Sequence, residues 1–114
     1  MKVLVTGSSG FIGFHLVNNL LKSGHHVTGI DNHNDYYDPS LKEYRKSLLE
    51  CDNFVFYQQD INNMSLDDSN FDLAINLAAQ AGVRVKKTKQ YLYKHSNTIG
   101  FESFCEFCVA KKIK

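Results

Sequence analysis

Three glycines near the amino terminus have the spacing of a phosphate-binding turn. Gly7, Gly10 and Gly13 follow a short apolar run and precede residues with helical periodicity. The first glycine lets the chain turn sharply, the second leaves room for a pyrophosphate, and the third lets the helix pack closely on a sheet. The phosphates then meet a helix N-terminus, where free N–H groups favour negative charge. We therefore predict a dinucleotide site rather than an ordinary tight turn.

A carboxylate ends the second apolar run, at Asp31. At that position it can accept hydrogen bonds from the hydroxyls of an adenosine ribose. It would also repel a 2′-phosphate, and Asn32 and His33, which follow it, bring no arginine. This favours NAD over NADP. The alternative for Asp31 alone is a solvated aspartate at the start of a turn.

A weaker signal follows the third apolar run, at Asp60 and Ile61. The carboxylate could accept from the adenine amino group, and the backbone N–H could donate to an adenine ring nitrogen. Aspartate is common after strands, so this pair indicates adenine binding only beside the glycine loop.

The elements that must position these residues alternate between strand and helix. Strands are predicted over residues 2–6, 26–31, 53–58 and 71–78, and helices over 11–22, from Asp38 and Pro39 onward, and over 97–112. Asp38 would cap the second helix, and Pro39 suits its first turn. Such alternation implies an α/β fold, a Rossmann-type doubly wound parallel sheet. The sheet would be incomplete, with its strands in the order 3-2-1-4.

Apolar periodicity also predicts which side chains face the core. The second helix should bury Leu41, Tyr44, Leu48 and Leu49, and the last helix Phe101, Phe104, Cys105 and Cys108. Cys105 and Cys108 form a Cys-x-x-Cys pair, which could be a redox or zinc motif. Because there is no second pair and the sulfurs share an apolar face, we interpret them as small buried hydrophobes. The histidines show no ligand spacing and are predicted at the surface: His15, His25, His26, His33 and His95.

Composition limits the partners and the location. The chain has 114 residues and a formal net charge of +1, so we expect at most one domain and no attraction to nucleic acid or anionic membranes. No apolar stretch is long enough to span a bilayer. An odd number of cysteines without a secretory signal fits a reducing compartment, and we expect a cytoplasmic protein.

Taken together, these motifs resemble a known family. The segments that carry the likeness are Thr6-Gly7-Ser8-Ser9-Gly10-Phe11-Ile12-Gly13, Asp31, Asp60-Ile61 and Leu77-Ala78-Ala79-Gln80-Ala81-Gly82-Val83-Arg84. They are similar to the extended short-chain dehydrogenase/reductases, the NAD-dependent nucleotide-sugar epimerases and dehydratases. The segment from Asp31 to Lys42, Asp-Asn-His-Asn-Asp-Tyr-Tyr-Asp-Pro-Ser-Leu-Lys, further resembles a loop of UDP-glucuronate 4-epimerases.

The resemblance implies a role for each matching residue. The pyrophosphate would be held by Gly7, Gly10, Phe11, Ile12 and Gly13, the adenosine ribose by Asp31 and Asn32, and the adenine by Asp60 and Ile61. Leu77, Ala78, Ala79 and Gln80 would run past the nicotinamide-side ribose, and Asn97 would lie near the cofactor. Arg84 would lie near the sugar nucleotide, expected to be a UDP-sugar. The alternative for Arg84 is a solvated arginine after a turn.

The sequence departs from the family in two places. After Arg84, the segment Val85-Lys86-Lys87-Thr88-Lys89 replaces an aromatic and proline pattern, which puts the substrate-side loop in question. None of the six tyrosines has a lysine four residues later, so the family's catalytic Tyr-x-x-x-Lys pair is not in this chain. We expect residues 1–114 to be the N-terminal part of a dinucleotide-binding domain, without the catalytic and substrate-binding portion and inactive alone.

Two interpretations remain at this point. The chain is the NAD-binding portion of an epimerase or dehydratase that oxidises and reduces C4 of a UDP-sugar. Alternatively, it is a non-catalytic fragment that at most binds a nucleotide. In either case an unpaired fourth strand would leave an exposed edge, through which copies of the chain could associate.

Overall fold

The computed structural model describes residues 1–36, 38–67, 70–82 and 84–114. Tyr37 and Val83, which belong to the motifs above, lie outside the described residues. Within those ranges, no helix is both long and apolar enough to cross a membrane.

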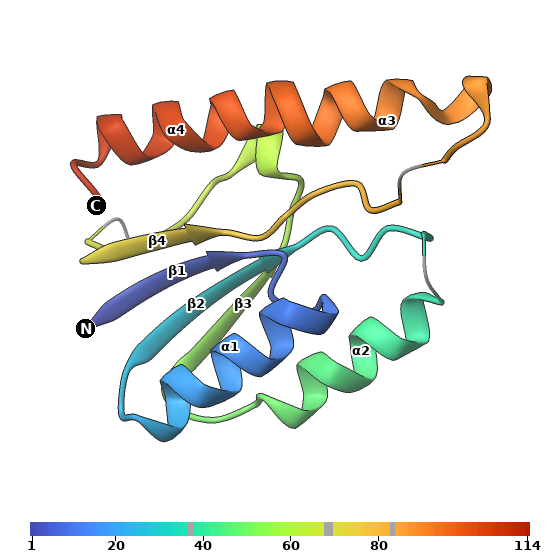
Figure 1. The fold of residues 1–114 in the computed structure, drawn as a ribbon. Coiled ribbons are helices and arrows are strands. Elements are labelled where there is room, and N and C mark those ends of the chain that lie inside the picture. Colours follow the sequence, from blue (N-terminus) through green and yellow to red (C-terminus); the bar gives the residue numbers. More distant parts are fainter. Residues whose placement is uncertain (37, 68–69, 83) are drawn as a thin grey trace.

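A parallel sheet of four strands forms the centre of the molecule (Figure 1). Its strands are β1 (Lys2–Thr6), β2 (His26–Asp31), β3 (Phe54–Gln58) and β4 (Leu73–Asn76), in the order β3-β2-β1-β4. Thr6 pairs with Ile30 on one side and Asn76 on the other, and Asp31 pairs with Gln58. All four strands therefore end at the same edge of the sheet. The predicted fold class and strand order are confirmed.

Helices cover both faces of this sheet (Figure 1). One face carries α1 (Phe11–Lys22) and α2 (Pro39–Leu48). The other carries a continuous helix made of α3 (Tyr91–Tyr93), η3 (Lys94–Ile99) and α4 (Gly100–Ala110). Two short turns, η1 (Ile61–Asn63) and η2 (Lys87–Lys89), connect the elements.

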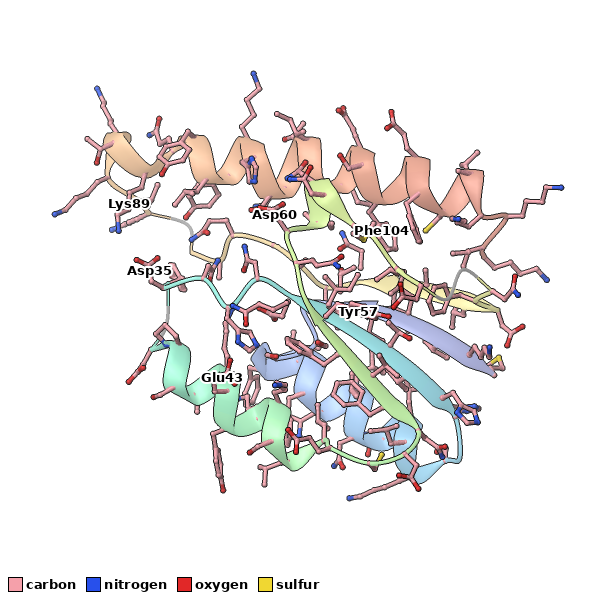
Figure 2. All side chains as sticks on the ribbon, turned by 180° about the vertical axis from the view of Figure 1, so that it is seen from behind. Asp35, Glu43, Tyr57, Asp60, Lys89 and Phe104 are labelled. Atoms are coloured by element: carbon pink, nitrogen blue, oxygen red, sulfur yellow. The ribbon has the colours of Figure 1, made fainter. Side chains whose placement is uncertain are left out.

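Strand β1 supplies both halves of the core because side chains along a strand alternate between faces. Val3 and Val5 pack with Val17 of α1, whereas Leu4 packs with Phe104 of α4. Figure 2 shows Phe104 pointing from its helix toward the sheet. These buried contacts fix the sheet between its two helical layers.

The prediction for the ends of α1 and α2 is confirmed. Gly24 lies just beyond α1 with a φ of 80°, the left-handed region that glycine adopts without strain. Asp38 caps α2 by accepting a hydrogen bond from the backbone N–H of Ser40, at 2.9 Å. This bond holds the pKa of the Asp38 carboxyl below its usual value.

The predicted apolar stripe of α2 is wrong for three of its four members. Leu49 is buried, but Leu41, Tyr44 and Leu48 are exposed. The buried residue of this helix is Lys42. The physical reason is that α2 lies over the polar turns at the end of the sheet, where charged side chains find partners that leucines would not.

Two other boundaries differ from the prediction. β4 is shorter than 71–78, because the chain leaves the sheet after Asn76 and enters the site. The last helix begins at Tyr91 rather than at residue 97, and the wide turn of η3 shifts its register. Its buried stripe runs through Gly100 and Phe104. Phe101, predicted to face the core, is therefore exposed.

The outer edge of β4 is partly covered by the end of the chain. The Ala74 N–H donates to the Lys114 carbonyl oxygen at 2.8 Å. Association of copies through this edge stays a prediction.

Candidate functional site

The glycine loop joins β1 to α1 at the carboxyl edge of the sheet. Gly7 has a φ of 69°, and a Cβ on it would lie 2.6 Å from the Leu77 carbonyl carbon. A Cβ on Gly13 would overlap the carbonyl oxygen of Gly7. These two glycines are therefore required by the turn and by close packing. Gly10 precedes the first turn of α1, whose N–H groups no side chain caps.

A cavity of about 390 Å³ lies at this edge. Its walls bring together five segments that are far apart in the sequence, the last of them represented by Ser96 of η3. The residues among them that were expected to hold a cofactor are Gly7, Gly10, Phe11, Ile12, Gly13, Asp31, Asn32, Asp60, Ile61, Leu77, Ala78 and Ala79. Gln80 and Asn97, also expected there, are not among its walls. The structure thus gathers nearly all of the expected residues around one space.

Asp31 is 5% exposed and accepts hydrogen bonds from three directions. Its Oδ2 accepts from the Ser9 N–H at 3.1 Å. Its Oδ1 accepts from the His33 N–H at 2.9 Å and from Lys42 Nζ at 3.2 Å. A solvated aspartate would have none of these partners. The carboxylate is held rigidly against the glycine loop and faces the cavity.

Lys42 is the charged residue of the cavity wall that the sequence analysis missed. It is 8% exposed, pairs with Asp31, and also donates to Asn34 Oδ1 at 3.2 Å. The residues directly after Asp31 include no cation that could reach it, whereas α2 brings Lys42 back to it from further along the chain. Its place at the end of the segment from Asp31 to Lys42, which carries the resemblance, was the available signal.

The predicted adenine pair lies on the other side of the cavity. Asp60 Oδ1 accepts from the Asn62 N–H at 2.8 Å, and its Oδ2 lies 2.9 Å from His95 Nε2. Partial burial acts to raise the pKa of Asp60, but the hydrogen bonds from Asn62 and His95 outweigh it, so this pKa lies below its usual value. Figure 2 shows Asp60 beside the long helix that carries His95.

The turn after β4 forms the third wall. The Thr6 hydroxyl donates to Asn76 Oδ1 and accepts from the N–H groups of Leu77 and Ala78, each at 3.2 Å. Beyond it, Asn97 bonds the backbone of Gln80 twice, accepting from its N–H at 2.7 Å and donating to its carbonyl at 3.2 Å. Asn97 therefore shapes the wall from behind.

Arg84 lines a second hollow, of about 570 Å³. Lys86, Lys89 and His95 share this hollow, which adjoins the first at Asn32 and Asp60. Figure 2 shows Lys89 and Asp35, another of its residues, at the same end of the molecule. The contact of Arg84 with a sugar nucleotide stays a prediction.

The sequence matches the model of the NAD dependent epimerase/dehydratase family over residues 3–114. The chain belongs to this family. Among curated relatives, UDP-glucuronate 4-epimerase 4 of Arabidopsis thaliana is 44% identical over 111 residues, which are 93% of this chain and 25% of the relative. Protein CapI of Staphylococcus aureus is 42% identical over 111 residues, which are 93% of this chain and 33% of that protein. The chain thus spans a quarter to a third of these relatives.

Solved structures of family members agree with the fold. UDP-glucuronic acid 4-epimerase from Bacillus cereus, solved in complex with NAD, aligns with all of this chain at a TM-score of 0.86 and 36% identity, over 38% of its own length. A Y149F mutant of that enzyme, solved in complex with UDP-4-deoxy-4-fluoro-glucuronic acid and NAD, aligns at a TM-score of 0.88 and 38% identity. The chain is homologous to the NAD-binding part of UDP-sugar epimerases.

Among the residues that the structure describes, no three His, Cys, Asp or Glu side chains gather to hold an ion. Cys105 and Cys108 are half-buried free thiols, and burial, together with the neighbouring Cys105, raises the pKa of Cys108. One histidine contradicts the prediction: His33 is buried. It lies against the glycine loop, where the bend of the chain after Asp31 carries it inward.

Proposed function

We propose that residues 1–114 form the NAD-binding portion of a nucleotide-sugar epimerase or dehydratase of the UDP-glucuronate 4-epimerase type. The observation that carries this proposal is the single cavity shared by the glycine loop, Asp31, the Asp60–Ile61 pair and the turn after β4. Four segments that the motifs single out independently meet there, as an extended dinucleotide requires.

Each part of NAD has a matching surface. The pyrophosphate would lie at the start of α1, bounded by Gly7, Gly10, Phe11, Ile12 and Gly13. The adenosine ribose would meet Asp31 and Asn32, with Lys42 able to donate to a hydroxyl oxygen. The adenine would lie by Asp60 and Ile61. The nicotinamide-side ribose would pass Leu77, Ala78 and Ala79, with Gln80 and Asn97 supporting that wall, and Arg84 would face the sugar nucleotide.

Of the chemistry of such an enzyme, this chain supplies cofactor binding but not the catalytic acid and base. NAD, when bound, supplies the hydride acceptor for transient oxidation at C4 of the sugar. The residues of this chain bind and orient the cofactor, and none of its tyrosines has the lysine that would make it the catalytic acid and base. We therefore propose cofactor binding without catalysis for residues 1–114.

Calorimetric titration of NAD tests the proposal, with Gly10→Val as the disabling variant. The Gly10 backbone is extended, with φ −70° and ψ 173°, and a Cβ there would lie 3.1 Å from the Gly7 carbonyl oxygen. Valine therefore requires only a small shift of the loop, and it places methyl groups where the pyrophosphate would lie. Gly24→Asn is the matched control, because Gly24 lies in open space and asparagine tolerates its positive φ. We expect saturable binding by the wild type and the control, and none by Gly10→Val.

The competing interpretation predicts a different result. If a folded wild-type sample shows no saturation with millimolar NAD, the cofactor-binding proposal is wrong for this chain, and a non-catalytic fragment remains. Circular dichroism of each sample separates loss of binding from loss of fold.

A further inference from the structure

A buried histidine connects the glycine loop to α2. His33 Nε2 lies 2.9 Å from Ser9 Oγ, and its Nδ1 lies 2.8 Å from Glu43 Oε1. The ring stacks on Phe56 of β3, with centroids 5.1 Å apart. A φ of 51° at His33 bends the chain so that this ring reaches under the loop. Loop, strand and helix thus meet at one imidazole.

The hydrogen bonds determine which ring nitrogen carries the proton. An ionised Glu43 can only accept, so Nδ1 must donate to it. In the neutral ring Nε2 is then an acceptor, and the Ser9 hydroxyl donates to it. This order of serine, histidine and carboxylate is also that of hydrolytic triads. Ser9, however, is 1% exposed and can meet no substrate, so the arrangement must serve another purpose.

All three polar groups of Ser9 are held by neighbouring side chains. Its N–H donates to Asp31, its hydroxyl to His33, and its carbonyl accepts from Arg45 Nη1 at 3.3 Å. Ser9 directly precedes Gly10, which lines the cavity. The position of Gly10, and of the first N–H groups of α1, therefore depends on how firmly Ser9 is held.

Helix α2 supplies three of the groups that hold this loop. Lys42 pairs with Asp31, Glu43 with His33, and Arg45 with the Ser9 carbonyl. Figure 2 shows Glu43 on the side of α2 that faces the sheet. The polar face of α2, which replaces the predicted leucine stripe, is thereby explained as a brace for the glycine loop.

We propose that His33 is a positioning residue for cofactor binding, which holds Ser9 and thereby fixes the pyrophosphate-binding end of α1. The proposal rests on the proposed NAD-binding function and adds a residue outside the cavity to it. The charged groups around the imidazole are Asp31 on β2, Glu43, Lys42 and Arg45 on α2, and Lys46, whose Nζ lies 5.2 Å from the centre of the Phe56 ring.

Two substitutions separate the two ends of the imidazole. Asparagine places its amide near the Nδ1 position and tolerates a positive φ, so His33→Asn keeps the bond to Glu43 and loses the one to Ser9. Glutamine reaches the Nε2 position, so His33→Gln restores the bond to Ser9 and loses the one to Glu43. We expect NAD to bind His33→Asn five- to tenfold more weakly, about the value of one buried hydrogen bond, and His33→Gln within about twofold of the wild type.

The control is His26→Asn, which removes an exposed imidazole and should leave the Kd unchanged. A double-mutant cycle of His33→Asn with Ser9→Ala should be non-additive, since both remove one hydrogen bond. Equal NAD affinity in the wild type, His33→Asn and Ser9→Ala would overturn the positioning role. An equal loss of NAD affinity in His33→Asn and His33→Gln would also overturn it.

A spectroscopic measurement keeps this proposal distinct from that of NAD binding. ¹⁵N NMR of the His33 ring should show that the neutral imidazole carries its proton on Nδ1 without any ligand, and Glu43→Ala should yield a mixture of tautomers. A ring with its proton on Nε2 overturns the inferred network whether or not NAD binds. The inferred tautomer in a wild-type chain that fails to bind NAD would instead count against the cofactor proposal.

Discussion

The ammonium group of Lys42 lies 3.2 Å from Asp31 Oδ1, and both side chains are almost completely buried. A carboxylate proposed to meet the cofactor ribose is thus already paired with a cation from another element. Removing one member of a buried pair is costly, because the other charge is left without compensation.

Lys42→Met should therefore destabilise the fold while keeping most of the aliphatic volume. Asp31 retains its bonds to the N–H groups of Ser9 and His33, so we expect a loss of about 1–3 kcal/mol in the free energy of unfolding. Urea denaturation followed by circular dichroism measures it. Lys22→Met, at an exposed lysine in the last turn of α1, is the control and should cost only a few tenths of a kcal/mol. A similar loss in both variants would contradict the role of the pair.

Asp31 should also select between the two nicotinamide cofactors. A 2′-phosphate would approach its carboxylate, and Lys42 can offset that repulsion only in part because it is already shared with Asn34. We expect NADP to bind at least about tenfold more weakly than NAD, which corresponds to about 1.4 kcal/mol. Asp31→Asn should reduce this ratio. Parallel calorimetric titrations measure it, and equal affinity of the wild type for both cofactors would refute the selection.

Gly13 should tolerate no side chain. A Cβ there would overlap the carbonyl oxygen of Gly7, and neither backbone can move without separating α1 from the sheet. We expect Gly13→Ala to cost about 2–3 kcal/mol of unfolding free energy, as overpacking of a core does. Gly24→Ala meets open space and pays only for its positive φ, about 1 kcal/mol. Thermal denaturation should show a larger loss of stability for Gly13→Ala than for Gly24→Ala. The reverse order would contradict the packing argument.

The sheet could be predicted because its signals are local. Short apolar runs ending at glycine or aspartate predict parallel strands, and the alternation with helices then restricts their order. The strand order also predicts which residues lie around the cavity, because the carboxyl ends of parallel strands meet at one edge of the sheet. Asp31 and Asp60, separated along the chain, were predicted there because each ends or follows a strand and because the motifs around them resemble those of the family.

The face of α2 could not be predicted in this way. Apolar periodicity through Leu41, Tyr44 and Leu48 assumes that a helix meets a hydrophobic surface. α2 instead meets Asp31, His33 and the carbonyl of Ser9, and that surface exists only after the glycine loop has folded. The prediction that His33 lies at the surface was wrong because its burial depends on a positive φ, and no pattern in the sequence predicts that φ.

The pair of Asp60 and His95 should make stability depend on acid pH. The pKa of Asp60 lies below its usual value in the folded chain, so the stabilising effect of this carboxylate is present above the unfolded pKa, near 4. It is lost as the pH falls through the lower folded value. Both side chains are substantially exposed, at 32% and 46%, so the contribution should stay within about 1 kcal/mol.

His95→Gln tests this pair directly. Removing the imidazolium should raise the pKa of Asp60 toward its usual value, while the Asn62 N–H still holds the other oxygen and keeps part of the shift. ¹³C NMR titration of the Asp60 carboxyl carbon measures the change, and acid denaturation should begin at a slightly higher pH. His26→Gln is the control. His26 is an exposed residue at the start of β2, at the end of the sheet away from the cavity, so its substitution should leave the Asp60 titration unchanged. An unaltered curve in His95→Gln would show that Asn62 alone sets the Asp60 pKa.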